Sequence, residues 1–140
     1  MDYRVKAVIR QLERWKLPSS DSGKVVSKNR YAVPPAKVSN AELADSVNLS
    51  ASRLRLLFKA ETGLTIQQYV KRQRLQRAQE LARTTFLRVS EIADLLGFDD
   101  VSHFVRDFRL MFGVTPETYR RAAHEVHEQP ARLLNSYCGN

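Results

Sequence analysis

Two stretches decide the fold: ELADSVNLSASRLRLLFKAETGLTIQQY at residues 42–69, and EIADLLGFDDVSHFVRDFRLMFGVTPETY at residues 91–119. The second repeats the first at an offset of 49 residues before the central turn and 50 residues after it, so the second copy has one extra turn residue. Self-similarity of this kind marks a duplicated supersecondary unit. The recurring residues after the turn are Phe58, Gly63, Thr65 and Tyr69, which return as Phe108, Gly113, Thr115 and Tyr119.

Each copy has the pattern of two short helices joined by a tight turn. The first helix is broken by residues 48–50 (Asn-Leu-Ser) in one copy and 97–100 (Gly-Phe-Asp-Asp) in the other. Asn and Gly tolerate left-handed backbone at a helix end, and the Ser or Asp that closes each break can cap the next helix. That helix has apolar residues at helical spacing and ends near Gly63 or Gly113. The sequence therefore predicts two helix-turn-helix units.

Between the two copies, residues 66–83 contain no Gly or Pro and mix apolar with basic side chains. We expect one long helix here. Its 18 residues would span roughly 27 Å, which approaches the ~34 Å between successive major-groove faces on one side of a duplex. Two helix-turn-helix units joined by such a helix could contact the same side of a DNA duplex, one helical turn of the DNA apart.

The matching residues of the second copy are Ile92-Ala93, Gly97-Phe98, 102–109, 112–116 and Tyr119-Arg120. They closely resemble the DNA-binding domain signature of AraC/XylS-type bacterial transcription regulators. The first copy resembles it as well, and the likeness covers about residues 39–121, with residues 2–16 in the place of the family's opening helix. The connecting helix matches through Arg74-Leu75, Ala78 and Leu81. The resemblance implies an all-α, monomeric reader of a bipartite, asymmetric DNA site, usually an activator near a promoter.

We therefore expect an all-α fold of about seven helices. Its parts are an N-terminal amphipathic helix (1–17), a Pro/Ser/Gly-containing basic linker (18–38), the first helix-turn-helix (39–65), the connecting helix (66–83), the second helix-turn-helix (84–124) and a C-terminal tail (125–140). The linker is longer than the family's usual connection. Two readings stay open, an arm that reaches DNA and a spacer, and the spacer is the preferred one.

Hydrophobic spacing assigns most large apolar residues to the cores. The opening helix should dock on the first helix-turn-helix through one apolar face: Val5, Val8, Ile9, Leu12 and Trp15. The first core is predicted to contain Leu43, Ala44, Val47, Leu54, Leu57, Phe58 and Tyr69. The second is predicted to contain Ile92, Ala93, Leu96, Phe98, Phe104, Phe108, Phe112 and Tyr119.

The charge balance indicates a polyanionic partner. The 140 residues carry a net charge of +8, which is the electrostatic footprint of nucleic-acid binding. Residues 1–38 contribute +6 and residues 39–86 contribute +4, whereas 87–124 and 125–140 contribute −1 each. The N-terminal half is therefore expected to supply most of the affinity for phosphate, while the second helix-turn-helix reads bases or meets another protein.

In the first recognition helix, the predicted outward face contains Ser52, Arg55, Leu56 and Lys59, with Arg53 beside it. Arg55 can form a bidentate pair with a guanine edge, and Lys59 suits a phosphate. The family pattern usually has an Arg where this chain has Leu56. Two readings of Leu56 stay open: contact with a thymine methyl group, or packing inward.

In the second recognition helix, the corresponding face contains Val101, Ser102, Val105, Arg106 and Arg109, with His103 packing or bonding a phosphate. Arg106 matches the family's Arg and is the main candidate for contact with a base or phosphate. The alternative is a surface ion pair with an aspartate of the same region: Asp99, Asp100 or Asp107.

Other classes of function find little support. No phosphate-binding loop, nucleophile–base pair or carboxylate dyad is visible, so we expect no catalysis and no cofactor. His124 and His127 are two weak metal ligands near a helix end, and no metal site is expected. The lone Cys138 excludes an internal disulfide and, with no signal peptide or apolar run of membrane length, favours the bacterial cytoplasm and nucleoid.

The sequence thus predicts a sequence-specific regulator that binds double-stranded promoter DNA, with RNA polymerase as a further partner, no membrane association and no small-molecule effector site in this chain. The preferred mode of action is activation. The alternative is an interaction protein whose first helix-turn-helix binds DNA while the second docks on RNA polymerase or another regulator.

Overall fold

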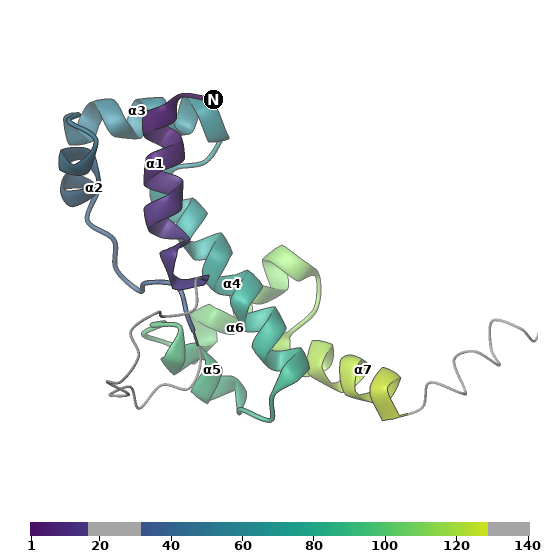
Figure 1. Ribbon diagram of the computed structural model, residues 1–140. Helices are drawn as coiled ribbons and strands as arrows, with labels where there is room; N and C mark the ends of the chain where they lie inside the picture. Colours follow the sequence, from purple (N-terminus) through teal and green to yellow (C-terminus); the bar gives the residue numbers. More distant parts are fainter. Residues whose placement is uncertain (17–31, 129–140) are drawn as a thin grey trace, which may run out of the picture. The chain divides into compact units, whose positions relative to one another are not determined.

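The computed structural model describes residues 1–16 and 32–128, and every regular element in these ranges is helical (Figure 1). This part of the chain forms seven α-helices and a short 3-10 helix, η1 (Arg14–Lys16). The α-helices are α1 (Tyr3–Leu12), α2 (Asn40–Ser46), α3 (Ala51–Thr62), α4 (Ile66–Thr84), α5 (Val89–Leu95), α6 (Val101–Phe112) and α7 (Pro116–Glu128). The prediction of an all-α fold with about seven helices is confirmed.

The helix ends differ in detail from the predicted segments. The opening helix stops at Leu12 and continues as η1 instead of running to residue 16. The connecting helix extends to Thr84, and α7 continues to Glu128, into the segment expected as a tail. Residue 17, residues 18–31 of the linker, and residues 129–140, which include Cys138, lie outside the described residues.

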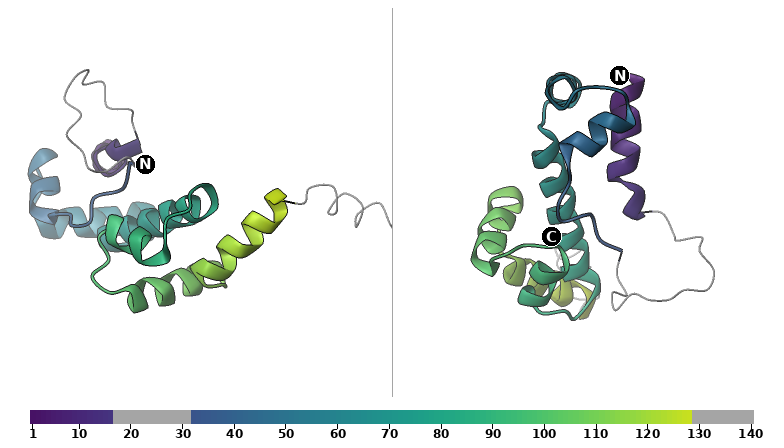
Figure 2. Two further views of the ribbon diagram at one scale, coloured as in Figure 1. Left: turned by 90° about the horizontal axis from the view of Figure 1, so that it is seen from below. Right: turned by 90° about the vertical axis from the view of Figure 1, so that its left-hand side faces the viewer.

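The chain divides into two compact units, which we call the N-terminal and C-terminal units. The N-terminal unit contains Met1–Arg74 and Leu95–Gly97, and the C-terminal unit contains Leu75–Asp94 and Phe98–Asn140. The division falls inside α4, which is nevertheless one unbroken helix when viewed from several directions (Figure 2). The first part of α4 therefore packs in the core of the N-terminal unit, and the second part packs in the core of the C-terminal unit.

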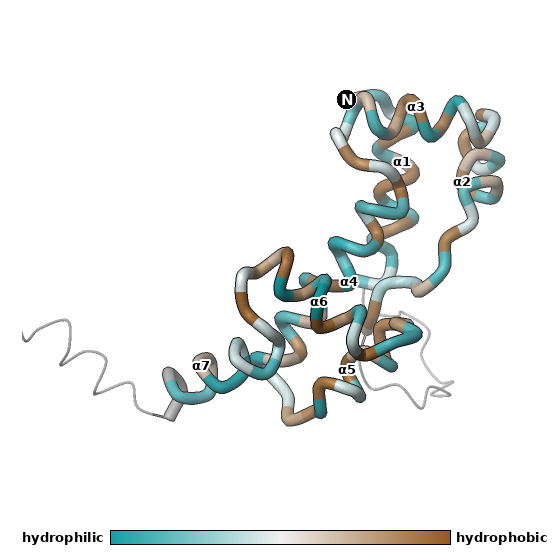
Figure 3. The backbone as a smooth tube through the Cα atoms, turned by 180° about the vertical axis from the view of Figure 1, so that it is seen from behind, coloured by the Kyte–Doolittle hydropathy of each residue, from teal (hydrophilic) through white to brown (hydrophobic). Residues whose placement is uncertain are grey.

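The core of the N-terminal unit combines α1 with the first helix-turn-helix. Val5, Val8 and Leu12 of α1 are buried, and they lie in one cluster with the buried residues of α2, α3 and α4: Leu43, Ala44, Leu54, Phe58, Ile66 and Val70. Apolar and hydrophilic residues accordingly alternate along α1 (Figure 3). The predicted docking of the opening helix is confirmed. Val47, Leu57 and Tyr69, which were also predicted to belong to this core, pack at its edge.

A polar contact fixes the C-terminal end of α1 to α4. The hydroxyl of Tyr69 donates a hydrogen bond of 2.7 Å to Oε1 of Glu13, and Nε2 of Gln73 approaches the same oxygen at 3.3 Å. Burial, followed by the neighbouring Glu13 carboxylate, raises the pKa of the Tyr69 hydroxyl well above its usual value. The hydroxyl therefore stays protonated and able to donate.

The C-terminal unit has an aromatic core. Phe104 and Phe108 of α6 are fully buried, and Phe108 contacts Phe112 and Tyr119 with ring centroids 4.6 and 6.0 Å apart. Ile92 and Ala93 are buried as predicted, and Leu75, Ala78, Leu81 and Ala82 of α4 are buried too. Leu96, predicted for the same core, is also buried, but it lies in the segment Leu95–Gly97 of the N-terminal unit. Arg120 anchors α7 by donating a hydrogen bond of 3.3 Å from Nε to the carbonyl of Ala82.

The two helix-turn-helix copies have the same turn. In the first, Asn48 has φ +57° and the N–H of Leu49 donates to the carbonyl of Ala44 at 2.9 Å. In the second, Gly97 has φ +79° and the N–H of Phe98 donates to the carbonyl of Ala93, also at 2.9 Å. These are the left-handed positions that the sequence predicts, so the repeat in sequence is a repeat in backbone geometry.

Candidate nucleic-acid interface

The recognition helix α3 is defined at both ends by local chemistry. Ser50 caps its start, because the Ser50 hydroxyl accepts a hydrogen bond of 3.2 Å from the N–H of Arg53. Gly63 ends it with φ +78°, and its N–H donates to the carbonyl of Lys59 at 2.8 Å. Leu54 and Phe58 are fully buried and hold one face of the helix against the core. The opposite face is left for solvent.

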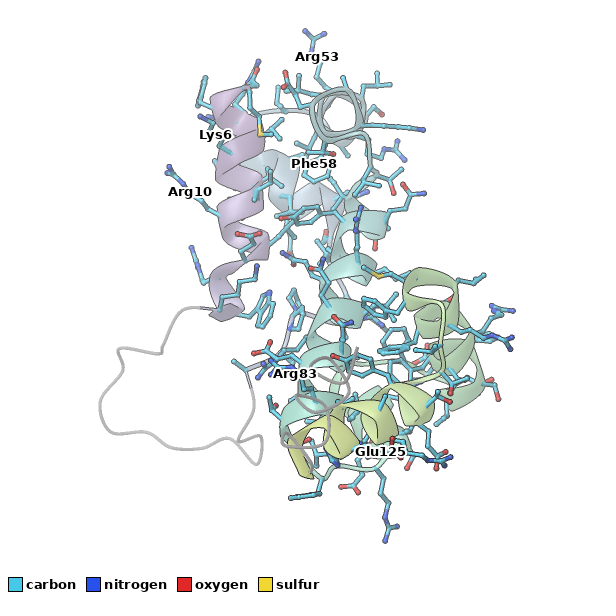
Figure 4. The ribbon with its side chains drawn as sticks, turned by 90° about the vertical axis from the view of Figure 1, so that its right-hand side faces the viewer. Lys6, Arg10, Arg53, Phe58, Arg83 and Glu125 are labelled. Atoms are coloured by element: carbon cyan, nitrogen blue, oxygen red, sulfur yellow. The ribbon has the colours of Figure 1, made fainter. Side chains whose placement is uncertain are left out.

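That outward face is the one predicted to touch DNA. Ser52, Arg53, Arg55, Leu56 and Lys59 are all exposed. Arg53 points away from the N-terminal unit, whereas Phe58 points into it (Figure 4). Nη2 of Arg55 lies 3.4 Å from the hydroxyl oxygen of Ser52, one turn back on the same helix. The exposed face of α3 thus presents three cations and one hydroxyl group around a leucine.

Leu56 is the residue for which the sequence left two readings. Its side chain is 74% exposed, so the reading in which it packs inward is wrong. The reason is its place on the helix. Leu56 lies two residues from both Leu54 and Phe58, and 100° per residue turns it roughly 160° away from each of these buried anchors.

The recognition helix α6 is built in the same way. The carboxylate of Asp100 accepts a hydrogen bond of 2.8 Å from the N–H of Ser102 at the start of the helix. Gly113 ends it with φ +84°. Phe104 and Phe108 take the place of Leu54 and Phe58 as the buried pair. Arg106 stands two residues from each of them and so faces outward, as Leu56 does on α3.

The remaining predicted residues of α6 share this outward face in part. Val101, Ser102, His103, Arg106 and Arg109 are exposed, and Val105 is half-buried. Val105 therefore divides its surface between the edge of the core and the outward face. Ser102 receives the helix cap through its backbone and keeps its side chain exposed.

The proposed ion pair of Arg106 is absent from the residues that the structure describes. Within residues 1–16 and 32–128, neither Arg106 nor Arg109 takes part in an ion pair, and the same holds for Arg55 and Lys59 of α3. The carboxylate of Asp100 is occupied by the helix cap. The cations on both recognition helices are therefore available to an external partner.

One contact near the turns was not predicted. In the sequence, Arg74 of α4 stands out only as part of the family pattern, yet its guanidinium binds two carbonyl groups of the N-terminal unit. Nη1 donates to the carbonyl of Ala36 at 3.2 Å, and Nη2 lies 3.4 Å from the carbonyl of Gly97. Both acceptors are backbone atoms, more than twenty residues away, so no side-chain pattern points to them.

Two further features are absent from the described residues: a cluster of metal-ligating side chains and a membrane-spanning helix. Among these residues, no three His, Cys, Asp or Glu side chains gather as metal ligands. The side chain of His127 falls outside the described part. None of the helices in residues 1–16 and 32–128 has both the length and the apolar character of a membrane-spanning segment.

Comparison with known proteins places this geometry in a family. A sequence profile described as a helix-turn-helix domain matches residues 43–122, more than half of the chain. The transcriptional activator RhaR of Cronobacter sakazakii is 44% identical over 68 residues, which are 49% of this chain and 24% of that protein. The probable transcriptional regulator LumQ of Photobacterium leiognathi is 38% identical over 84 residues, 60% of this chain and 34% of that protein.

Structural similarity extends further along the chain than these sequence matches. The crystal structure of a probable AraC family transcriptional regulator from Rhodopseudomonas palustris superposes with a TM-score of 0.67 and 25% identity, covering 87% of this chain and 98% of that one. The matches to the two curated relatives span only 24% and 34% of their lengths. Because the family profile, the repeat and the two capped recognition helices all agree, this chain belongs to the AraC/XylS family of DNA-binding transcription regulators.

Proposed function

We propose that this chain binds a bipartite, asymmetric site in double-stranded promoter DNA, with α3 and α6 each inserted in the major groove. The proposed contact residues are the outward-facing ones: Ser52, Arg53, Arg55, Leu56 and Lys59 on α3, and Val101, Ser102, His103, Val105, Arg106 and Arg109 on α6. Arginine is the side chain that most often reads guanine in the major groove, and lysine suits phosphate.

The observation that carries this proposal is the face that each recognition helix leaves exposed. On α3 and α6, the buried pair of large apolar residues lies on one side and the arginines and lysines lie on the other, without ion pairs among the described residues. Exposed cations on a helix of the right diameter for the major groove are what binding to a duplex requires. A face meant only for solvent would tolerate acidic residues there equally well.

The length of α4 supports binding to two neighbouring groove faces. Its 19 residues span roughly 28 Å, close to the ~34 Å between successive major-groove faces. Since the two recognition helices differ in residue type at matching positions, the two half-sites should differ in sequence. We propose a single chain, without dimerisation, on such an asymmetric site.

We further propose that the chain activates transcription, since the relative RhaR is named a transcriptional activator. An activator bound near a promoter would act through contact with RNA polymerase. The proposed place of action is the nucleoid in the bacterial cytoplasm. The excess of basic residues before position 87 would supply most of the affinity for phosphate.

The experiment that tests this function is selection of bound duplexes from a random DNA library at near-physiological salt. We expect an enriched motif with two unlike half-sites about one helical turn apart, roughly 10 base pairs. A motif with a single half-site would restrict sequence reading to one recognition helix. A folded, helical protein that enriches no sequence would refute the proposal.

A further inference from the structure

The centre of the outward face of α3 is apolar. Leu56 is 74% exposed, and it stands on the side of the helix opposite the fully buried Leu54 and Phe58. Removing a leucine side chain from water is favourable, because the free energy falls with the apolar area that is buried. A side chain exposed to this extent at the middle of a recognition surface gains that free energy only when a partner covers it.

The neighbours of Leu56 restrict the chemistry of that partner. Arg53, Arg55 and Lys59 are exposed around it, and none forms an ion pair within the described residues. The partner must therefore be strongly anionic and still present an apolar group at its centre. The major groove of DNA meets both conditions, because phosphates line its edges and the C5-methyl group of thymine is the apolar feature of its floor.

Comparison of the two recognition helices strengthens this assignment. With the offset of 50 residues, Leu56 of α3 corresponds to Arg106 of α6, and Arg55 corresponds to Val105. The order of cation and apolar residue is thus transposed between the copies. Arg106 of α6 can donate hydrogen bonds to a base edge, whereas Leu56 at the matching position of α3 has no donor or acceptor and can make only apolar contacts.

We propose that Leu56 contacts the C5-methyl group of a thymine in the half-site bound by α3, and that it determines specificity at that base pair. This inference rests on the proposed DNA binding. The α3 half-site would then have a thymine at the position that corresponds to the base contacted by Arg106 in the α6 half-site.

The test removes one methyl group at a time from the DNA. In the duplex selected by the wild-type protein, each thymine is replaced in turn by deoxyuridine, which keeps base pairing and loses only the methyl group. We expect one replacement to weaken binding of the wild-type protein about 3- to 5-fold, the effect of one buried methyl-sized group. The Leu56→Ala variant should bind the thymine and deoxyuridine duplexes equally well at that position.

A matched control separates this contact from the general loss of an exposed leucine. Leu110 of α6 is 78% exposed, so Leu110→Ala removes a comparable side chain. The Leu110→Ala variant should keep the wild-type preference for thymine over deoxyuridine at the position identified with Leu56. Circular dichroism checks that both variants remain helical, as expected for changes at exposed sites.

Two results would overturn the inference. One is that no deoxyuridine replacement affects wild-type binding. The other is that the sensitive replacement affects Leu56→Ala as strongly as the wild-type protein. Either result leaves the selected DNA motif in place, so it is distinct from failure of the proposed function, in which no motif is enriched at all.

Discussion

The close approach of Gly97 to Ala36 gives the sharpest prediction about stability. Gly97 has φ +79°, and a Cβ atom added there would overlap Cβ of Ala36 and lie 3.3 Å from its Cα. Arg74 holds the same two residues through their carbonyl groups, at 3.2 Å for Ala36 and 3.4 Å for Gly97. The backbone of Ala36 therefore has little freedom to move aside.

The Gly97→Ala substitution should act through two separate effects. An L-residue in the left-handed region costs about 1–2 kcal/mol, and overpacking against Ala36 adds about 1–3 kcal/mol. The control is Gly63→Ala in the same unit, where φ is +78° and nothing lies within 4 Å of the added Cβ. The control loses stability only through the left-handed backbone, so the difference in unfolding free energy between the two variants measures the cost of the overlap with Ala36.

The assay is urea denaturation followed by circular dichroism, for the wild-type protein, both single variants, Ala36→Gly and the double variant Gly97→Ala/Ala36→Gly. The double-mutant cycle should give a coupling free energy of about 1–3 kcal/mol, because removing the Cβ of Ala36 makes room for the new one. Equal losses for Gly97→Ala and Gly63→Ala, with no coupling to Ala36, would refute the packing described for this turn.

Three further predictions concern single side chains. Lys59→Ala should weaken binding to all DNA sequences alike and lower the slope of log affinity against log salt by about 1; an unchanged slope excludes a phosphate contact. Phe108→Ala should cost about 3–5 kcal/mol of unfolding free energy, whereas Leu110→Ala should change it by less than about 0.5 kcal/mol; thermal or urea unfolding decides. Tyr69→Phe should cost about 1–2 kcal/mol through its hydrogen bond to Glu13. The pKa of Tyr69 in the folded protein is raised above the ordinary 10.0. The stability that the Tyr69 hydroxyl contributes is therefore lost as pH rises beyond 10, and the difference in unfolding free energy between the wild-type protein and Tyr69→Phe should become smaller there.

Much of the fold follows from rules that act over a few residues. The left-handed positions at Asn48 and Gly97, and the caps at Ser50 and Asp100, are set by residue types whose backbone and hydrogen-bonding preferences are local. The repeat then predicts the second copy from the first. Most of the exposed face of each recognition helix could also be predicted from spacing; the exceptions are Leu56, whose direction stayed open, and Val105, which is half-buried.

The features that could not be predicted depend on contacts distant in sequence. Arg74 binds the carbonyl of Ala36, 38 residues away, and Tyr69 bonds Glu13, 56 residues away. Backbone carbonyls carry no signature in the sequence, and a glutamate near a helix end has many candidate partners. The direction of Leu56 stayed open because an apolar side chain is usually buried, whereas its spacing from Leu54 and Phe58, both predicted to be buried, favours the outward face.

The most direct test of the central claim repeats the DNA selection with Arg55→Ala and Arg106→Ala in parallel. If each recognition helix reads its own half-site, Arg55→Ala should relax the preferred bases in one half-site and Arg106→Ala in the other. Each should cost about 1–3 kcal/mol of binding free energy on the wild-type site. Relaxation of the same half-site by both variants, or an unchanged motif with Arg106→Ala, would contradict the claim that α3 and α6 both read sequence.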